Sequence, residues 1–246
     1  MKWTVLGFQS PYPGPGGATP GYLLETSSGK DILIDCGSGV MAELAHYLPT
    51  YQLEALMLSH LHHDHIADVL TLQYALHLQH IQGKRKKPLP VYAPRRPESW
   101  WQKLRFRTVT EPVDIESQTK IDVDGVSIAF HRTDHGIPCY AMEIREGFRT
   151  ILYGADSGVK TDWENMCREP DLFVCEATFL EAQIPEDNVP HLSARQAAQA
   201  AERIGAKALL LTHVYPDNDL EDIRREAAPH FSGDLYVAEK GWNIAL

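Results

Sequence analysis

The most constraining feature of this chain is a run of six residues that holds four histidines and one carboxylate, His60-Leu61-His62-His63-Asp64-His65. Burying such a cluster without partners would incur repeated desolvation costs. A divalent metal ion instead turns the same nitrogens and oxygens into a stabilised ligand set. The spacing lets His60 and His62 bind one ion while Asp64 and His65 bind a second. We therefore expect a binuclear metal site, with His63 as an unliganded rim residue.

A second apolar run of the same form occurs late in the chain. Ala55–Ser59 precedes His60 and Ala208–Thr212 precedes His213, so each run joins apolar residues, one hydroxyl residue and a histidine. Two buried strands that each deliver a histidine at the carboxyl end would converge on one site from two halves of an α/β sandwich. Alternatively, each buried strand simply ends in a polar residue. The two runs alone leave both interpretations open.

Hydrophobic patterning predicts an α/β arrangement along the whole chain. Helical spacing or capping signals and strand signals alternate, and the middle of the chain reads as antiparallel sheet. We expect helices at Ile66–Ile81, Ser193–Ile204 and Pro216–Phe231, and strands at Trp3–Phe8, Tyr22–Thr26, Ile32–Cys36, Leu89–Tyr92, Thr150–Tyr153, Ala208–Thr212, within Lys120–Arg145 and within Leu235–Leu246. A chain of 246 residues is one large domain or two small ones, and we expect a single domain over 1–246.

Charge argues against general affinity for a polyanion, because the formal net charge is −10. The exception is Lys84–Arg107, which holds nine basic residues and one acidic residue together with Trp100 and Trp101. Such a segment binds phosphates and stacks bases, or it is a solvated basic surface, which we favour. Its position relative to the histidine cluster does not follow from the sequence.

The cysteines and the amino-terminal residues bear on the cellular compartment. Cys36, Cys139, Cys167 and Cys175 form no CxxC pair, so spacing gives no case for a disulfide framework. No apolar run approaches 18 residues, and the start of the chain runs into a Pro/Gly-rich stretch before a signal-peptide core is complete. We expect a cytoplasmic protein with reduced thiols and no membrane partner.

Together these motifs resemble those of the metallo-β-lactamase superfamily. His60-x-His62-x-Asp64-His65 is similar to the family's first metal motif, and Ile34-Asp35-Cys36-Gly37 is similar to the stretch that follows an early strand. His135, in His135-Gly136-Ile137-Pro138, looks like the third-ligand histidine. His131 competes for that role, but we expect it to belong to a strand. The resemblance implies a four-layer αβ/βα sandwich.

Two further positions complete the ligand set that the resemblance implies. Asp156 matches the bridging carboxylate, and His213 matches the last ligand. One ion would then be held by three histidines and the other by a carboxylate and two histidines, with Asp156 between them. The implied sets are His60, His62 and His135 for the first ion, and Asp64, His65 and His213 for the second. Zinc is the expected metal, with manganese and iron as alternatives.

Within the superfamily, the chain is most similar to the ribonuclease Z branch. Cys175-Glu176-Ala177-Thr178 resembles that branch's His-Glu-Ala-Thr stretch, with cysteine in place of histidine, and His191-Leu192-Ser193 resembles its later His-Ser-Thr segment. The match implies that Glu176 orients His191, which lies beside the metals without binding them. The alternatives are a capping or paired carboxylate at Glu176 and a plain loop residue at His191.

The chain also departs from that branch. Bacterial ribonuclease Z enzymes carry a long basic arm that grips tRNA, commonly between the third ligand and the bridging aspartate. Here only 21 residues separate His135 from Asp156, which leaves no room for the arm. We therefore expect no specific tRNA binding.

The resemblance implies a metal-dependent hydrolase, most closely a phosphodiesterase that acts on small or single-stranded phosphodiesters through a metal-bound hydroxide. Asp64 would orient the hydroxide as well as bind its metal, and His191 would protonate the leaving oxygen. Expected substrates are small molecules or short oligonucleotides, and a homodimer stays open. The alternatives are a carboxylic ester or lactone hydrolase of the same superfamily and a non-catalytic, metal-stabilised binding protein.

Overall fold

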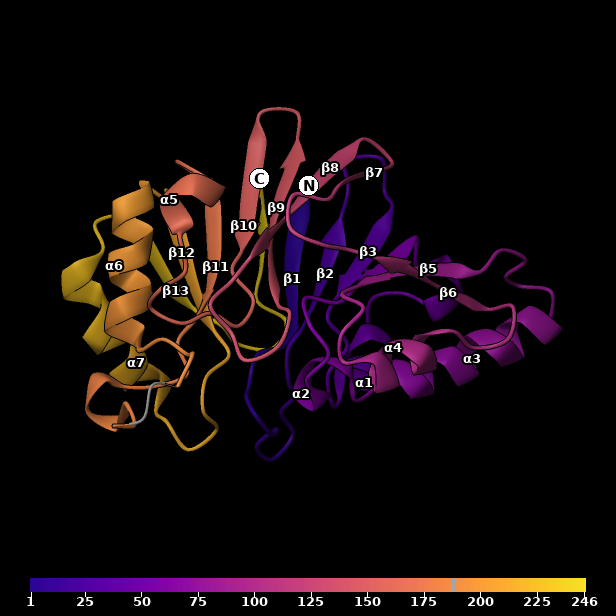
Figure 1. Cartoon of the computed structure of the whole chain (residues 1–246), viewed down its shortest axis with the longest axis horizontal. Coiled ribbons are helices and arrows are strands. Elements are labelled where there is room, and N and C mark those ends of the chain that lie inside the picture. Colours follow the sequence, from indigo (N-terminus) through magenta and orange to yellow (C-terminus); the bar gives the residue numbers. More distant parts are fainter. Residues whose placement is uncertain (187–188) are drawn as a thin grey trace.

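In the computed structural model, which describes residues 1–186 and 189–246, the strands form two seven-stranded sheets packed face to face (Figure 1). The first sheet has the order β14 (Asn243–Ala245), β1 (Lys2–Gly7), β2 (Gly21–Glu25), β3 (Asp31–Ile34), β4 (Ala55–Met57), β5 (Leu89–Ala93) and β6 (Thr110–Asp114). The second has the order β13 (Asp234–Val237), β12 (Ala208–Thr212), β11 (Leu172–Glu176), β10 (Arg149–Tyr153), β9 (Tyr140–Glu146), β8 (Val126–Arg132) and β7 (Lys120–Val123).

Both sheets are mixed in the same way. Strands β3 to β6 are parallel to one another, and so are β10 to β13. The remaining neighbours pair antiparallel, including the run from β7 to β10 that the sequence predicts for the middle of the chain. Parallel strands present their carboxyl ends at one edge of a sheet, and ligand sites form there in open α/β sheets.

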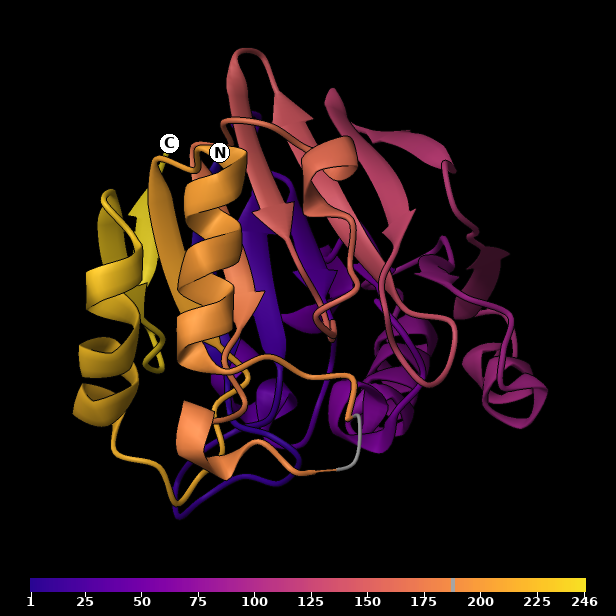
Figure 2. The same ribbon diagram turned by 60° about the vertical axis from the view of Figure 1, so that its left-hand side comes forward.

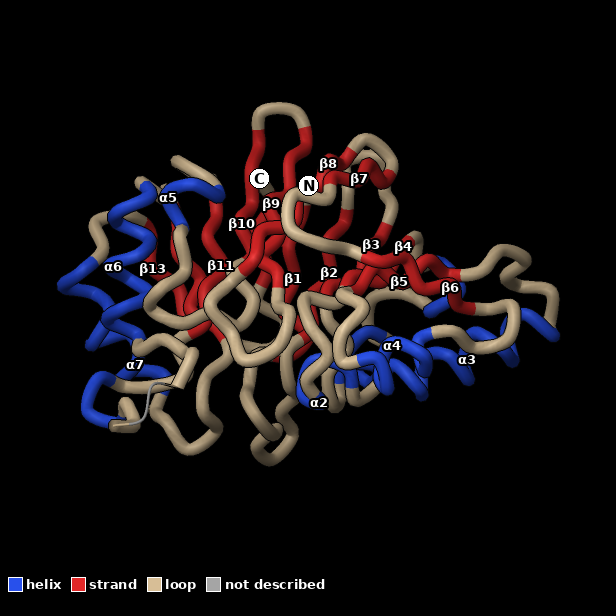
Figure 3. Tube along the Cα trace, viewed as in Figure 1, coloured by secondary structure: helices blue, strands red, loops and turns tan. Residues whose placement is uncertain are grey.

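Helices cover the outer face of each sheet, which gives the four-layer sandwich (Figure 3). The first sheet carries α1 (Val40–Leu44), α2 (His63–Ile66), α3 (Val69–Ile81) and α4 (Glu98–Leu104), with a short 3-10 turn at Thr50–Gln52. The second carries α5 (Trp163–Met166), α6 (Ala194–Ile204) and α7 (Leu220–Ala227), with 3-10 turns at Glu181–Gln183 and Ala228–His230. Figure 2 shows α6 and α7 side by side in front of the second sheet.

The core follows from the alternation of side chains along each strand. In β3, Ile32 and Ile34 lie in the core between the two sheets, whereas Leu33 packs in the core under the helices of the first sheet. Leu72 and Leu76 of α3 fill that second core. Both faces of the central strands are therefore buried, as expected for sheets covered by helices.

Helix α6 begins and ends where the sequence predicts. The Ser193 hydroxyl accepts from the backbone N–H of Gln196, and the Gln196 side chain accepts from the backbone N–H of Ser193. Gly205 ends the helix in the left-handed region at φ 70°, which costs glycine nothing. The alanines of α6 are buried against the second sheet.

Three sequence-based expectations need correction. The helix predicted at Ile66–Ile81 is two helices, because the backbone N–H of Asp68 donates to the carbonyl of Cys36 and its carboxylate accepts from the backbone N–H of Met41. Helix α4 and strand β6 were not predicted, since prolines and basic residues obscure their patterns. The final strand region divides into β13 and β14, which belong to different sheets.

Two further observations bear on the sequence-based expectations. All four cysteines are buried and free, as the absence of paired spacing predicts. Within the described residues, no helix is long and apolar enough to cross a lipid bilayer.

Candidate metal centre

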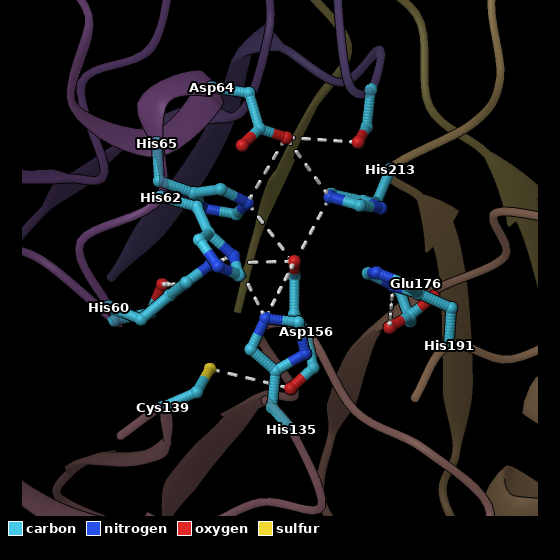
Figure 4. A network of polar contacts seen from close by, with 12 residues as sticks. His60, His62, Asp64, His65, His135, Cys139, Asp156, Glu176, His191 and His213 are labelled. Carbon is cyan, nitrogen blue, oxygen red and sulfur yellow. Dashed lines mark hydrogen bonds and ion pairs between the residues drawn. The ribbon is translucent and has the colours of Figure 1, made fainter. Parts of the chain in front are cut away.

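The chemistry-bearing residues lie where parallel strands of both sheets end. In the first sheet, Asp35 follows β3 and His60 follows β4. In the second sheet, Asp156 follows β10, Glu176 ends β11 and His213 follows β12. Figure 4 shows His60, His213 and Glu176 converging around Asp156. The two matching apolar runs of the sequence therefore do deliver their histidines to one site.

Backbone conformation at these strand ends is unusual. Asp35, Ala155 and His213 have φ values of 53°, 51° and 57°, in the left-handed region that residues other than glycine rarely adopt. Such strain costs on the order of 1–3 kcal/mol per residue and persists only where the surroundings enforce it. Here it turns the chain sharply, so that Asp156 and His213 face the opposite sheet.

The histidine-rich segment is tethered to the loop after β3. The backbone N–H of Cys36 donates to the carbonyl of His65 at 2.8 Å, and the Thr19 hydroxyl donates to the carbonyl of Asp64 at 2.7 Å. A Cβ on Gly37 would lie 2.0 Å from the Asp64 carbonyl oxygen. Position 37 therefore admits only glycine while the segment keeps this path.

The first ligand group comprises His60, His62, His135 and one oxygen of Asp156. Nδ1 of His62 lies 3.0 Å from Nε2 of His60 and 3.0 Å from Nε2 of His135. The Oδ2 atom of Asp156 lies 3.4 Å from Nε2 of His60 and 3.7 Å from Nε2 of His135. Three ring nitrogens and a carboxylate oxygen thus surround one point.

The second ligand group comprises Asp64, His65, His213 and the other oxygen of Asp156. The Oδ1 atom of Asp156 lies 3.1 Å from Nε2 of His65 and 3.1 Å from Nε2 of His213. The Oδ2 atom of Asp64 lies 3.7 Å and 3.5 Å from the same two nitrogens. Asp156 therefore turns one oxygen toward each group, which is the geometry of a bridging carboxylate.

The residues present fit divalent metal ions. Buried Nε2 of His65, Nε2 of His213 and Oδ1 of Asp156 have no hydrogen-bond partner among the described residues. Buried polar atoms without partners are costly and call for an ion or water. One ligand atom per residue lies within 4.8 Å of the others among His60, His62, His135 and Asp156, and likewise among Asp64, His65 and His213. Imidazole and carboxylate ligands suit zinc, manganese and iron.

Electrostatics keeps the histidines of the first group neutral, as metal binding needs, whereas for His65 the carboxylates of Asp156, Asp35 and Asp64 outweigh burial and raise the pKa well above its usual value. Burial, reinforced by neighbouring imidazoles, lowers the pKa of His60 and of His62 to about 4, so both rings are neutral near pH 7. Burial alone would raise the pKa of Asp156, but His213, His65 and His60 outweigh it and hold the pKa well below its usual value. Asp156 is therefore ionised and able to bind a metal ion.

His191 and Glu176 form a separate buried pair beside the two groups. Nδ1 of His191 donates to Oε1 of Glu176 at 2.9 Å, and the backbone N–H groups of Ser157 and Leu192 donate to the same carboxylate. Burial alone would lower the pKa of His191, but Glu176 outweighs it and raises the pKa to about 9. The ring of His191 stacks on that of His213, with centroids 5.4 Å apart.

A polar pocket of about 270 Å³ opens over the two groups. It is lined by Ser10, Pro11, His62, His63, Asp64, Asp156 and His191. The Ser10 hydroxyl donates to Oδ2 of Asp64 at 3.0 Å. His63 lies outside both groups and packs edge-on against Trp100, so it occupies the rim. A small substrate entering this pocket would meet Asp156 and His191 together.

Comparison with known proteins agrees with the fold and the site. A family model for the beta-lactamase superfamily domain matches residues 30–214, which span both ligand groups and His191. The chain belongs to the metallo-β-lactamase superfamily. It is 34% identical over 242 residues to YhfI, a probable metallo-hydrolase of Bacillus subtilis, and the match covers 98% of each chain. As a member of this family with such a donor set, the chain is a metallo-hydrolase.

Three further comparisons agree with this family. The crystal structure of YhfI superimposes with a TM-score of 0.94, covering 99% of this chain and 98% of that one. A ribonuclease Z of Mycobacterium bovis is 28% identical over 271 residues, covering 96% of this chain and 95% of its own. Human tRNase Z, short form, shares the fold, with a TM-score of 0.73 at 23% identity over 100% of this chain and 99% of that one.

The structure brings every predicted ligand of this metallo-β-lactamase site together. His135 lies in the first group, whereas His131 lies in β8 and pairs with Glu143 at 3.3 Å. Geometry also groups His191 with Asp156 and His213, so its position outside the ligand set stays a proposal.

Sequence reasoning missed the residues that support the ligands. Thr178 lies 2.8 Å from Nδ1 of His213 and donates to Glu176 at 2.7 Å. Ser59 and Tyr153 contact Asp35, which in turn contacts His65. Two sequence signals could have identified Asp35 and Ser59, namely the Ile34–Gly37 motif and the hydroxyl residue before His60. No sequence signal pointed to Tyr153.

The basic segment Lys84–Arg107 is divided between two ends of the first sheet. Arg85 donates to the carbonyl of Leu53, just before β4, whereas His60 follows the other end of that strand. Arg95 and Arg96 follow β5, which is parallel to β4, so they lie at the same edge as the metal centre. They line a groove of about 210 Å³ with Pro138, close to His135 in the chain.

Proposed function

We propose that this protein is a binuclear metal-dependent phosphodiesterase that acts on small or single-stranded phosphodiesters, in the manner of ribonuclease Z. The proposed ligands are His60, His62 and His135 for one ion, Asp64, His65 and His213 for the other, and Asp156 as the bridge. Zinc is the first candidate for both ions, and the site is proposed to lie in a single domain. Two divalent ions would lower the pKa of bound water and neutralise charge on phosphoryl oxygens.

The protein's own residues would orient the substrate and move the proton. Glu176 accepts from Nδ1 of His191 and so leaves Nε2 to donate to the leaving oxygen. Asp64, which receives the Ser10 hydroxyl, would orient the attacking water as well as bind its ion.

The observation that carries this proposal is the buried Glu176–His191 pair beside Asp156. A pKa raised to about 9 by Glu176 keeps His191 cationic near pH 7. A cationic acid attracts the anionic ground state of a phosphodiester and protonates its poorly departing alkoxide, whereas a neutral ester or lactone gains from the charge only as negative charge develops in its transition state. The relatives named ribonuclease Z support the same reaction class.

Small substrates are favoured because little of the surface can follow a long nucleic acid. The interval between His135 and Asp156 is filled by the hairpin of β9 and β10, whose tip at Gly147–Phe148 lies at the strand ends remote from the site. The lysines near Arg85 lie at the other end of β4 from His60. Few phosphate contacts remain, and affinity for nucleic acid rises with the number of such contacts.

A metal-reconstituted activity screen tests the function. It compares bis-p-nitrophenyl phosphate, single-stranded RNA, precursor tRNA and a lactone panel at matched metal loading. We expect rapid hydrolysis of the small phosphodiester and poor, strongly salt-sensitive cleavage of precursor tRNA. Faster turnover of a lactone than of any phosphodiester would establish the ester hydrolase instead, and specific 3′ cleavage of tRNA at physiological salt would refute the preference for small substrates.

A further inference from the structure

Asp35 is a fully buried carboxylate that belongs to neither ligand group and yet receives four hydrogen bonds. The backbone N–H of Ser59 donates to Oδ1 at 2.8 Å. Three donors meet at Oδ2, namely the Ser59 hydroxyl at 2.9 Å, the Tyr153 hydroxyl at 2.6 Å and Nδ1 of His65 at 2.8 Å. A carboxylate bonded this fully is held in one orientation.

These bonds determine which ring nitrogen carries the proton in one histidine of each ligand group. Nδ1 of His65 must donate, because an ionised carboxylate only accepts. The Ser59 hydroxyl has one proton, which Asp35 receives, so Ser59 accepts from Nδ1 of His60 at 3.0 Å. In both rings Nδ1 then carries a proton, which leaves Nε2 as the nitrogen that can bind a metal. Nε2 points toward Asp156, at 3.4 Å for His60 and 3.1 Å for His65.

Tyr153 holds this arrangement from the opposite sheet. It lies at the end of β10, three residues before Asp156, and is buried between the sheets. Its ring packs against Trp3 and Tyr22, with centroids 5.9 Å and 5.1 Å away, which fixes the direction of its hydroxyl. The hydroxyl therefore ties Asp35, in the first sheet, to the strand that carries the bridging carboxylate.

We propose that Asp35 and Tyr153 are positioning residues that couple the two metal ions, because one carboxylate presets a ligand in each group. Loss of this carboxylate or of its tether weakens both ions together. Loss of Thr178, which bonds Glu176 and, of the proposed ligands, His213, weakens the second ion alone. This inference rests on the proposed ligands and is independent of the proposed substrate.

The experiment is a zinc titration of the metal-free full-length chain against a chelating indicator, with two binding constants fitted for each variant. Removal of such outer-shell partners lowers metal affinity by about 10–100-fold. We expect Asp35→Asn and Tyr153→Phe to weaken both ions, Ser59→Ala chiefly the ion of the first group, and Thr178→Val only that of the second. Tyr22→Phe is the matched control, since it removes a buried hydroxyl of the same aromatic cluster that bonds Thr212 instead.

A spectroscopic readout separates positioning from general destabilisation. In nitrogen-15 correlation spectra of the zinc-loaded chain, His60 and His65 should both carry their ring proton on Nδ1. Ser59→Ala should change His60 alone, while thermal melting shows whether each variant folds. If Asp35→Asn does not fold, Tyr153→Phe still tests the coupling, because it deletes a single oxygen and is expected to fold. Equal affinities in Tyr153→Phe and the wild type, or loss of one ion only, overturn the coupling.

The outcome is distinguishable from failure of the proposed function. Inactivity toward every phosphodiester would remove the substrate assignment but leave the two binding constants and the tautomers as measured. A wild-type chain that binds a single ion would remove the binuclear site and the coupling with it.

Discussion

The two ligand groups differ in how firmly the protein holds them. In the second group, each side chain has a hydrogen-bond partner outside the ligand set. His65 bonds Asp35, His213 bonds Thr178, and Asp64 accepts from the Ser10 hydroxyl. In the first group, among the residues that the structure describes, only His60 has a short contact of this kind, through Ser59. His135 reaches the carbonyl of Pro190 at 3.4 Å, and His62 faces the pocket.

This difference follows from where the ligands come from. The second group is set on a short helix and on a strand end whose backbone is strained, and its histidines are fully enclosed. The first group draws His62 and His135 from loops. Because ordering a side chain costs free energy on binding, we expect the preorganised second group to bind its ion more tightly.

The largest expected effect comes from removing what the groups share. Asp156→Ala takes one oxygen from each ion, so both should be lost on dialysis against a weak chelator. We expect turnover of bis-p-nitrophenyl phosphate to fall by roughly 10³-fold or more, since metal ions supply several kcal/mol of transition-state stabilisation. Elemental analysis, with two ions expected in the wild type, checks it. Retention of one tight ion would show that the groups are independent.

His191 belongs to neither group in our assignment, and its removal tests that boundary. His191→Ala should leave both ions bound and lower kcat by about 10²–10⁴-fold on a phosphodiester with a poor leaving group, because protonation of that group is lost. A substrate with a nitrophenolate leaving group should be much less affected. Loss of an ion from this variant would make His191 a ligand, as its distance to Asp156 and His213 allows.

The difference in affinity is tested by one substitution in each group. His65→Ala removes a supported ligand and His62→Ala an unsupported one. We expect the second group of the intact protein to bind zinc about tenfold more tightly than the first group, and so to fill first. His62→Ala should therefore keep the tighter ion and His65→Ala should lose it. Calorimetric zinc titrations of both variants measure this, and equal tight-site constants in the two would contradict the ranking.

The smallest effect is expected from the lysines at the remote end of β4. Replacing Lys84, Lys86 and Lys87 with serine should leave both ions and hydrolysis of small phosphodiesters within about twofold, because exposed charges beyond a Debye length are screened. Arg85 is kept, since it bonds the carbonyls of Tyr51 and Leu53. Replacing Arg95 and Arg96 is the matched comparison. It should weaken the binding of short RNA more than the lysine replacements do. A reversed order would place the nucleic-acid path at the lysines.

The sequence predicts the parts of the site that are local or repeated. Four histidines in one short segment predict a metal site, and two matching apolar runs predict two strands that each end in a histidine at that site. The capping box at Ser193 predicts where α6 begins. Each of these signals lies within a few residues, where spacing and geometry are directly related.

What the sequence does not reveal depends on distant pairings. Tyr153 and Asp35 are 118 positions apart, and nothing in either neighbourhood shows that they bond. The break before α3 is equally hidden, because the contact between Asp68 and Met41 is tertiary while the hydrophobic period runs through it. Tertiary contacts override local propensity at such positions.

The burial of the four cysteines gives the protein a chemically silent background for labelling. Burial raises the pKa of the thiols of Cys36, Cys139 and Cys175 well above its usual value, so these groups neither ionise near neutrality nor meet a reagent. Phe148, at the tip of the β9–β10 hairpin, is by contrast fully exposed. Phe148→Cys would therefore be the one reactive thiol of the native chain. A fluorophore there would sit at the far end of the strand that leads to the bridging carboxylate.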